Sequence, residues 1–129
     1  ENLPAAVAMA EKLAGNLNTV IAISGKIDVI TDGNRSCILR NGCAAMARIT
    51  GSGCMLTALI GAFCGAYEDP FGATCTAMAA MGISGEIAET KRLYNGTGNA
   101  TFRNDLIDAV FNLTPEQLKQ GVCYEIYKR

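Results

Sequence analysis

The first stretch of the chain carries apolar residues on one face of a predicted helix. The residues that recur at spacings of three and four positions are Val7, Ala10, Leu13, Ala14 and Leu17. This spacing is typical of an amphipathic helix, and proline at position 4 suits a first helical turn. We therefore expect a helix over residues 4–17.

A group of short strands is predicted next. Residues 19–24 are β-branched and apolar, which is typical of a strand buried on both faces of an α/β sheet. Residues 26–31 read as a second strand, and Asp32-Gly33 is a signal for a two-residue hairpin turn. Residues 34–40 are then expected to return as an antiparallel strand, followed by a short extended piece at residues 46–49.

The rest of the chain has a mainly helical pattern. Helices are predicted over residues 54–67, 71–94 and 98–112. Thr114 followed by Pro115 is typical of the N-cap and first position of a fourth helix. Residues 124–127 fit either a terminal strand or the end of that helix.

Two uncharged runs raise the alternative of a membrane hairpin, at residues 49–67 and 70–85. The first run opens on loop residues, which leaves a helical part of 14 residues, whereas a membrane span needs about 20. The second run is only mildly apolar. We therefore expect both runs to form packed helices that do not cross a membrane.

Composition narrows the class of protein. The chain has 129 residues, the size of one domain. Only 18% of the residues are charged, against about 25% in typical domains, so the surface is expected to be unusually apolar for a monomer. The net charge of -1 excludes a strong basic field that would hold nucleic acid or an anionic membrane.

Histidine is absent from the sequence, and this absence excludes several kinds of site. Ser-His-Asp and Cys-His nucleophile systems cannot be built within the chain, nor can zinc sites with histidine ligands. The six cysteines include no C-x-x-C pair, which favours a reducing, cytoplasmic environment. Apart from Cys54, we expect them to pack as small apolar side chains.

One stretch, TGSGCMLT at residues 50–57, suggests function. An extended segment, a glycine-rich turn and a helix in succession present unpaired backbone N–H groups to an anion. Gly51 and Gly53 permit positive φ and the close approach of a phosphate. Cys54 lies in the first turn, where the helix dipole favours a thiolate. An ordinary turn with Ser52 as the helix N-cap fits the same residues, and the pattern is not a Walker P-loop.

Three smaller features have ordinary structural explanations. Asp28 and Asp32 flank a strand and fit either metal ligands or a solvated turn. Lys91-Arg92 is expected to complement the dipole at a helix end. The methionines at positions 55, 78 and 81 are expected to pack in the core rather than line a substrate pocket.

Several segments taken together carry a family resemblance. They are AISGKIDVITDG at 22–33, NG at 41–42, ITGSGCMLTAL at 49–59, AMA at 77–79, alanine at 88 and NATFRNDLID at 99–108. This combination resembles the hydroxyethylthiazole kinase family of the ribokinase-like superfamily, and its G-[ST]-G-C element is specific to that family. The resemblance implies an α/β, ribokinase-like three-layer fold. Residues 1–129 would be a single C-terminal portion of it, with a β-meander, a phosphate-binding turn and a helical layer.

The resemblance also implies roles for individual residues. Ser24 would contact ATP, and Gly51 would contact the thiazole substrate. The anion hole for the transferring phosphate would be formed by Gly51, Ser52, Gly53 and Cys54, with Cys54 at the position of the catalytic base. The implied reaction is phosphorylation of the hydroxyl of 4-methyl-5-(2-hydroxyethyl)thiazole by ATP with Mg²⁺, a salvage step toward thiamine.

Much of the enzyme would lie outside this chain. The resemblance implies longer subunits, whose N-terminal portion supplies a Met, an Arg and the acidic groups for Mg²⁺, so we assign no metal ligand here. It also implies a cytoplasmic homotrimer with active sites between subunits, and no nucleic-acid or membrane partner. We expect the chain alone to be inactive. The alternatives are a non-catalytic nucleotide- or phosphate-binding module and an inactive half-domain that needs a complementary chain.

Overall fold

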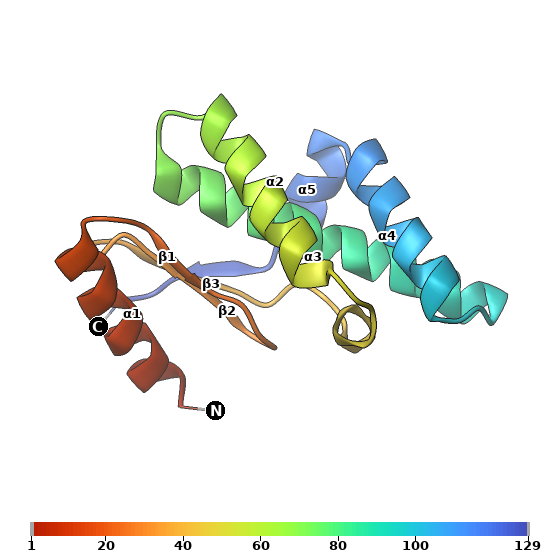
Figure 1. Cartoon of the computed structure of the whole chain (residues 1–129), viewed down its shortest axis with the longest axis horizontal. Helices are drawn as coiled ribbons and strands as arrows, with labels where there is room; N and C mark the ends of the chain where they lie inside the picture. The colour runs from red at the N-terminus through yellow and green to blue at the C-terminus, as the bar shows by residue number, and fades with distance from the viewer. Residues whose placement is uncertain (1, 129) are drawn as a thin grey trace.

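The computed structural model describes residues 2–128, in which helices cover both faces of a small sheet (Figure 1). The order of elements is α1 (Leu3–Leu17), β1 (Ile21–Ile23), β2 (Asp28–Thr31), β3 (Ser36–Leu39), the 3₁₀ helix η1 (Ala44–Arg48), α2 (Ser52–Ala66), α3 (Pro70–Asn95), α4 (Asn99–Asn112), α5 (Pro115–Gly121) and β4 (Tyr124–Ile126). The chain is therefore a mixed α/β protein, as expected. The last segment is a strand, which decides between the two expectations for residues 124–127.

The four strands form an antiparallel sheet in the order β1-β2-β3-β4. The first three strands follow one another as a meander, whereas β4 comes from the far end of the chain and pairs with β3, with Cys37 opposite Ile126. On one face, Val29 and Ile38 pack against Val7 and Ala10 of α1. The opposite face of β2 and β3 packs against α3. The two central strands are therefore covered on both sides.

The expectation that the first strand is buried on both faces is wrong for β1. Its central residue, Ala22, is exposed, and the two flanking isoleucines are half-buried. The reason is position: β1 lies at the edge of an antiparallel sheet, with α1 packed on one face of it. An apolar run alone does not distinguish a central strand from an edge strand.

The turn between β2 and β3 also differs from the expected two-residue hairpin. Thr31 pairs with Ser36, so four residues form the loop. The carboxylate of Asp32 accepts hydrogen bonds from the backbone N–H groups of Asn34 at 2.9 Å and Arg35 at 2.7 Å. These two bonds stabilise the wider loop, because an aspartate side chain can take the place of a backbone acceptor in a turn.

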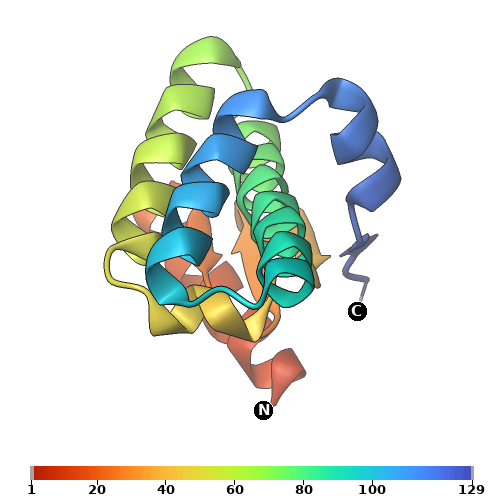
Figure 2. The same ribbon diagram turned by 90° about the vertical axis from the view of Figure 1, so that its right-hand side faces the viewer.

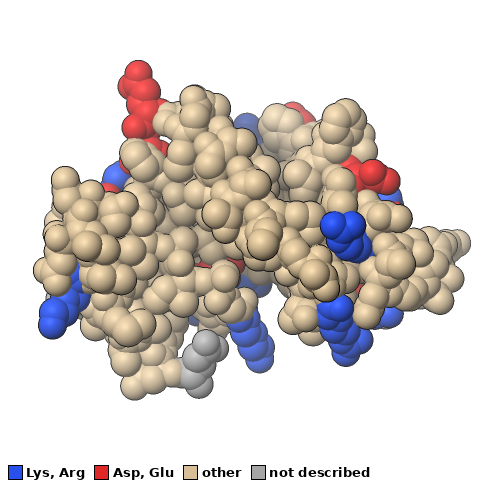
Figure 3. Space-filling view, viewed as in Figure 1, with Lys and Arg blue, Asp and Glu red and all other residues tan. Residues whose placement is uncertain are grey.

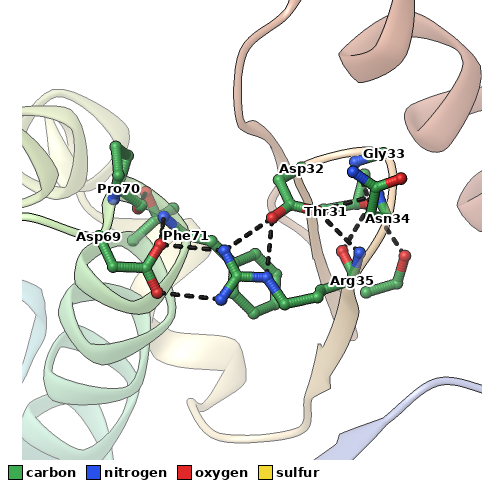
Figure 4. A network of polar contacts seen from close by, with 10 residues as sticks. Thr31, Asp32, Gly33, Asn34, Arg35, Asp69, Pro70 and Phe71 are labelled. Carbon is green, nitrogen blue, oxygen red and sulfur yellow. Dashed lines mark hydrogen bonds and ion pairs between the residues drawn. The ribbon is translucent and has the colours of Figure 1, made fainter.

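A charged network joins this loop to the start of α3 (Figure 4). The Arg35 guanidinium donates to Asp32 at 2.8 Å and to both oxygens of Asp69, at 3.0 and 3.1 Å. It also lies over the Phe71 ring, 4.5 Å from the ring centre. The hydrogen bonds from Arg35 lower the pKa of Asp69. Asp69 in turn caps α3 by accepting from the N–H of Phe71.

Helix α3 is the centre of the molecule. It has 26 residues, and 13 of them are buried, because it packs against the sheet, α2, α4 and α5. Figure 2 shows α2, α3 and α4 side by side, with α5 beyond them. The helix ends at Gly96, whose φ of 64° is in the left-handed region that favours glycine. Arg92 lies in its last turn, as expected, and forms an ion pair with Glu89.

Helix α2 differs sharply from α3, since it has no buried residue and no charged one. Its inner side packs on α3 through half-buried Leu56 and Ile60, while Cys54, Cys64 and several glycine and alanine residues are exposed. Among the described residues, no helix is both long and apolar enough to span a membrane. Helix α2 contributes an uncharged part of the apolar surface that the composition predicts. The large apolar side chains that are exposed lie on other elements, for example Leu17 on α1, Leu93 on α3 and Phe111 on α4.

Two further expectations are wrong. Residues 46–49 are not an extended piece, because Ala44–Arg48 form a 3₁₀ helix, with its buried Ala45 packed against Phe102 and Leu106 of α4. The cysteines other than Cys54 are not all core residues. Cys37 is buried and Cys43 and Cys75 are half-buried, but Cys64 and Cys123 are exposed.

Candidate functional site

The glycine-rich turn forms an open helix N-terminus. Gly51 is the N-cap of α2, with a φ of 90° that favours glycine, and no side chain caps the helix. Ser52 is the first helical residue and not the cap, so the alternative of an ordinary Ser N-cap is wrong. The carbonyl of Gly51 accepts from Met55. In the described part of the chain, the N–H groups of Ser52, Gly53 and Cys54 thus stay available to an external anion.

Gly53 does not have the positive φ that the sequence analysis allowed for it. It lies in the first turn of α2 and does not have positive φ, so only Gly51 needs the left-handed conformation. A Cβ built on either glycine would meet no atom within 4 Å. The space over the turn is therefore open, and of the two glycines only Gly51 has a backbone conformation that favours glycine.

A cavity of about 740 Å³ lies in front of the turn. It brings together residues that are far apart in sequence: Ser24, Gly25 and Lys26 after β1, Arg40 and Asn41 after β3, and Ser52 and Gly53 at the start of α2. Gly51 and Cys54 do not line the cavity, and Cys54 is exposed. Of the five residues with expected roles, the structure therefore places three on one cavity and two beside it.

Asp28 holds one wall of the cavity in place. Its carboxylate accepts a hydrogen bond from the backbone N–H of Gly25 at 2.9 Å, which fixes the loop that carries Ser24 and Lys26. Burial raises the pKa of Asp28, although the hydrogen bond from Gly25 acts in the opposite direction. Neither of the two expectations for Asp28, metal ligand or solvated turn, describes this half-buried position.

The opposite wall is held by a second carboxylate, Glu86 of α3. It accepts from the N–H of Gly42 at 2.9 Å and from the amide of Asn41 at 3.1 Å. Asn41 also accepts from the N–H of Cys123 at 2.7 Å, and a Cβ on Gly82 would approach its side chain to 2.7 Å. The tight contact among α3, this loop and the segment before β4 shapes the cavity.

The electrostatics of the site come from a few groups. Lys26 and Arg40 line the cavity, and Arg40 forms a 3.5 Å ion pair with exposed Glu125. Figure 3 shows basic side chains scattered over one face of the molecule rather than gathered into a patch. The site therefore depends on backbone N–H groups and the dipole of α2 more than on a cluster of positive side chains.

No group of three or more cysteine, aspartate or glutamate side chains among residues 2–128 is arranged to hold a metal ion. Within residues 2–128, Asp28 is the only carboxylate that lines the cavity, and Asp32 is bound to Arg35. The residues described here therefore do not fit a magnesium site of their own.

Sequence reasoning missed the residues that support the walls. Asp28 was named from the sequence, but as a metal ligand or a turn residue. Asn41 and Gly42 were named only as part of the family resemblance, and Glu86 was not named. Met78 and Met81 are buried in the core, as expected, but they also line the cavity. No local pattern marks Glu86, because its partners lie more than 40 positions away along the chain.

The chain is a mixed α/β protein in which an uncapped helix N-terminus and a serine-bearing loop share one cavity, and such a helix N-terminus suits an anion such as phosphate. The comparison with known families is more specific. The chain belongs to the hydroxyethylthiazole kinase family, whose sequence profile matches residues 1–116.

Individual relatives agree with this assignment. The chain is 41% identical over 127 residues to hydroxyethylthiazole kinase 2 of Methanosphaera stadtmanae, with 98% of this chain and 45% of that protein covered. It is 49% identical over 106 residues to hydroxyethylthiazole kinase of Clostridium beijerinckii, covering 82% of this chain and 38% of that one. The chain thus spans less than half the length of these relatives.

The fold is also similar to that of a solved structure. The hydroxyethylthiazole kinase protein from Pyrococcus horikoshii OT3 superposes with a TM-score of 0.85 at 27% sequence identity. The match covers 97% of this chain and 47% of the other. The arrangement of helices and strands described above is therefore similar to part of that larger protein.

Proposed function

We propose that the chain is the C-terminal portion of a ribokinase-like hydroxyethylthiazole kinase and supplies its phosphate-binding turn. The complete enzyme would phosphorylate the hydroxyl of 4-methyl-5-(2-hydroxyethyl)thiazole with ATP, a salvage step toward thiamine. The observation that carries this proposal is the cavity of about 740 Å³, where the loop of Ser24 lies opposite Ser52 and Gly53 at the open N-terminus of α2.

The glycine-rich turn would orient the transferring phosphate and stabilise its negative charge. Phosphoryl transfer spreads negative charge over the phosphate oxygens, and catalysis consists mainly of orienting the reactants and stabilising that charge. The N–H groups of Ser52, Gly53 and Cys54 and the positive end of the α2 dipole supply fixed donors for this purpose. Ser24 would contact ATP, and Gly51 would contact the thiazole.

Cys54 would accept the proton of the substrate hydroxyl. As the terminal phosphoryl leaves ADP and bonds to the substrate oxygen, that oxygen loses its proton to the Cys54 sulfur. No histidine takes part in this proton transfer, because the sequence contains none. Cys54 is exposed in this chain, so the wall that would bring substrate against it belongs to the rest of the enzyme.

The remaining parts of the proposal concern the complete protein. Residues 1–129 would form one portion of a larger kinase domain, and the complete subunits would assemble as a cytoplasmic homotrimer. Because the described residues do not fit a magnesium site, we assign no magnesium ligand to this chain and derive no step through the ion.

The test is thiazole-dependent ADP formation by this chain joined to the N-terminal portion of the Methanosphaera stadtmanae relative. Gly53→Val should lower kcat/KM at least about a hundredfold, because a branched side chain would fill the space that a phosphate needs over the turn. Gly61→Val is the matched control, since Gly61 lies on the same helix and an added Cβ also meets nothing within 4 Å.

Wild-type turnover in a folded Gly53→Val hybrid would contradict the anion-hole assignment. A wild-type hybrid that binds ATP but forms no ADP would contradict the kinase proposal and favour the non-catalytic module. Loss of turnover in the Gly61→Val control would show that the effect of Gly53→Val is not specific to the turn.

A further inference from the structure

The cavity of about 740 Å³ lies on the ATP side of the proposed site. Ser24, which would contact ATP, lines the cavity, whereas Gly51 and Cys54, which would serve the thiazole, do not. Residues 40–44 form another part of the same lining. This wall therefore faces the nucleotide rather than the thiazole, a step that rests on the proposed function.

A single carboxylate oxygen holds two successive residues of this wall. Glu86 lies on α3 and does not itself line the cavity. Its Oε1 atom accepts a hydrogen bond from the backbone N–H of Gly42 at 2.9 Å and one from the side-chain amide of Asn41 at 3.1 Å. Because these bonds meet at one atom, a change at Glu86 reaches the wall directly.

The Asn41 side chain ties the wall to a further segment. Its Nδ2 atom also donates to the Gly121 carbonyl at 2.8 Å, and its Oδ1 atom accepts from the N–H of Cys123 at 2.7 Å. Both amide hydrogens are therefore used by groups of the protein. Asn41 lines the cavity, but its donors act on the position of the wall and not on a ligand.

Two glycines of α3 bring the wall close enough for these bonds. A Cβ on Gly82 would approach the Cβ of Asn41 to 2.7 Å, and a Cβ on Gly85 would collide with the sulfur of Met46. Gly82, Gly85 and Glu86 are spaced three and four positions apart, so they share one face of the helix. The wall is thus fixed by close packing and by hydrogen bonds to the same face.

We propose that Glu86, acting through Asn41 and Gly42, is a positioning residue for ATP. The residue next to this pair is Arg40, whose side chain lines the cavity and is 42% exposed. Its ion pair with Glu125 is long, at 3.5 Å, so the guanidinium can turn to a phosphate, for which it is a strong partner. Glu86 fixes the wall that presents this group to the triphosphate.

The proposed role separates the two substrates. Loss of the Glu86 oxygen leaves the Gly42 N–H and the Asn41 amide without their acceptor, and the wall that carries Arg40 shifts. The thiazole contact at Gly51 lies outside this cavity. Binding of ATP should therefore weaken while binding of the thiazole is kept.

The test uses the hybrid of this chain with the N-terminal portion of the Methanosphaera stadtmanae relative. Glu86→Leu should raise the KM for ATP, and its Kd by calorimetry, at least about tenfold. The KM for the thiazole should stay within about twofold of wild type. Glu86→Gln retains an oxygen that can accept both hydrogen bonds, so it should stay within about threefold of wild type for ATP.

Glu89→Leu is the matched control. Glu89 lies on the same helix, and its carboxylate accepts from Arg92 of that helix at 2.6 and 2.8 Å. This variant also replaces a carboxylate by an apolar side chain, yet it leaves Asn41 and Gly42 with their acceptor. We expect it to leave the KM values for ATP and thiazole unchanged.

Should Glu86→Leu not fold, Asn41→Asp makes the same comparison. A carboxylate at position 41 would face the Glu86 carboxylate and the Gly121 carbonyl, so the affinity for ATP should fall. Adding Glu86→Gln to Asn41→Asp should recover part of it, because one of the two like charges is removed.

An unchanged affinity for ATP in folded Glu86→Leu, or in Asn41→Asp, would overturn the proposal. An equal loss for ATP and thiazole would show a general structural role instead, and Glu86→Gln as weak as Glu86→Leu would overturn positioning by hydrogen bonds. A wild-type hybrid that binds ATP but forms no ADP contradicts the proposed function alone, since the Kd comparison still decides the role of Glu86.

Discussion

Gly51 and Gly53 stand two positions apart, yet their backbones differ. Gly51 has a φ of 90°, where a side chain is strained, and Gly53 has ordinary helical geometry. Replacing Gly51 by alanine should therefore lower the free energy of unfolding by about 1–2 kcal/mol, whereas Gly53→Ala should be neutral or slightly stabilising. Urea unfolding of the two variants beside the wild-type chain measures the difference. Equal stability of the two variants would contradict the left-handed conformation at Gly51.

Substitutions of Cys54 can distinguish two roles for this residue, general base and covalent nucleophile. A carboxylate can accept the hydroxyl proton at this position as well as a thiolate can. In the complete enzyme, Cys54→Asp should keep activity, whereas Cys54→Ala should lose roughly a hundredfold or more in kcat, the usual scale for loss of a general base. Measuring kcat for both variants, with a mass-spectrometric search for phosphorylated cysteine, checks this. An inactive Cys54→Asp together with phosphocysteine in the wild type would show a nucleophile instead.

Asp28 should make stability depend on pH. Burial raises its pKa above the ordinary value of 3.8, so the folded chain holds this proton more tightly than the unfolded chain does. The contribution to stability is full below pH 3.8 and is lost as pH rises through the higher pKa of the folded state. Asp28→Asn keeps an oxygen for the Gly25 N–H but removes the charge.

We therefore expect Asp28→Asn to gain stability relative to the wild type as pH rises from about 3 to about 7. Urea unfolding across this range is the measurement, and the exposed Asp108→Asn on α4 is the matched control. A relative stability of Asp28→Asn that stays constant or falls over the same range would contradict the effect of burial.

Among the elements, the short helix α5 has a well-formed cap at its start. It has seven residues, none buried, but Thr114 and Gln117 form a capping box at its start. Thr114→Ala should lower the free energy of unfolding by about 1 kcal/mol, while Thr101→Ala, at an exposed position inside α4, should have little effect. Thermal unfolding compares the two. An unfolding temperature of Thr114→Ala equal to that of the wild type would show that packing against neighbouring elements, and not the cap, stabilises α5.

The helices and strands also show which structural features can be predicted from local sequence patterns. The helices over α1 to α4 were predicted to within two residues at each end, and the Thr114 cap was predicted correctly, because periodicity and caps are local. The edge position of β1 and the 3₁₀ helix η1 were not predicted, since each depends on contacts with distant residues. The wider β2–β3 loop was also missed, although the Asp32 hydrogen bonds that stabilise it are local. At the site, the open turn at Gly51 was predicted. Asp28 and Glu86, which hold other parts of the cavity lining, are recognised only in the folded chain.

At the scale of the whole molecule, the chain corresponds to less than half of its relatives in the hydroxyethylthiazole kinase family. It covers 45% of the Methanosphaera stadtmanae relative, and α2 exposes an uncharged surface. We expect the 129-residue chain alone to form ADP in the presence of thiazole at a negligible rate, and the N-terminal portion of a relative, added in trans, to restore turnover. A coupled enzyme assay of ADP formation measures the rate of the chain alone and the rate with the N-terminal portion added. Turnover by the chain alone at a normal enzymatic rate would contradict the proposal.

The pairing of β4 with β3 has a consequence for the order in which the chain folds. The ion pair between Arg40 and Glu125 joins residues 85 positions apart, so this edge of the sheet closes only after every helix between them has been synthesised. Helices form from near neighbours and need not wait. During synthesis on the ribosome, β3 therefore stays without its second partner strand. The wall of the apolar cavity between the sheet, α3 and α5 that contains Tyr124 and Ile126 is therefore the last part of this cavity to form.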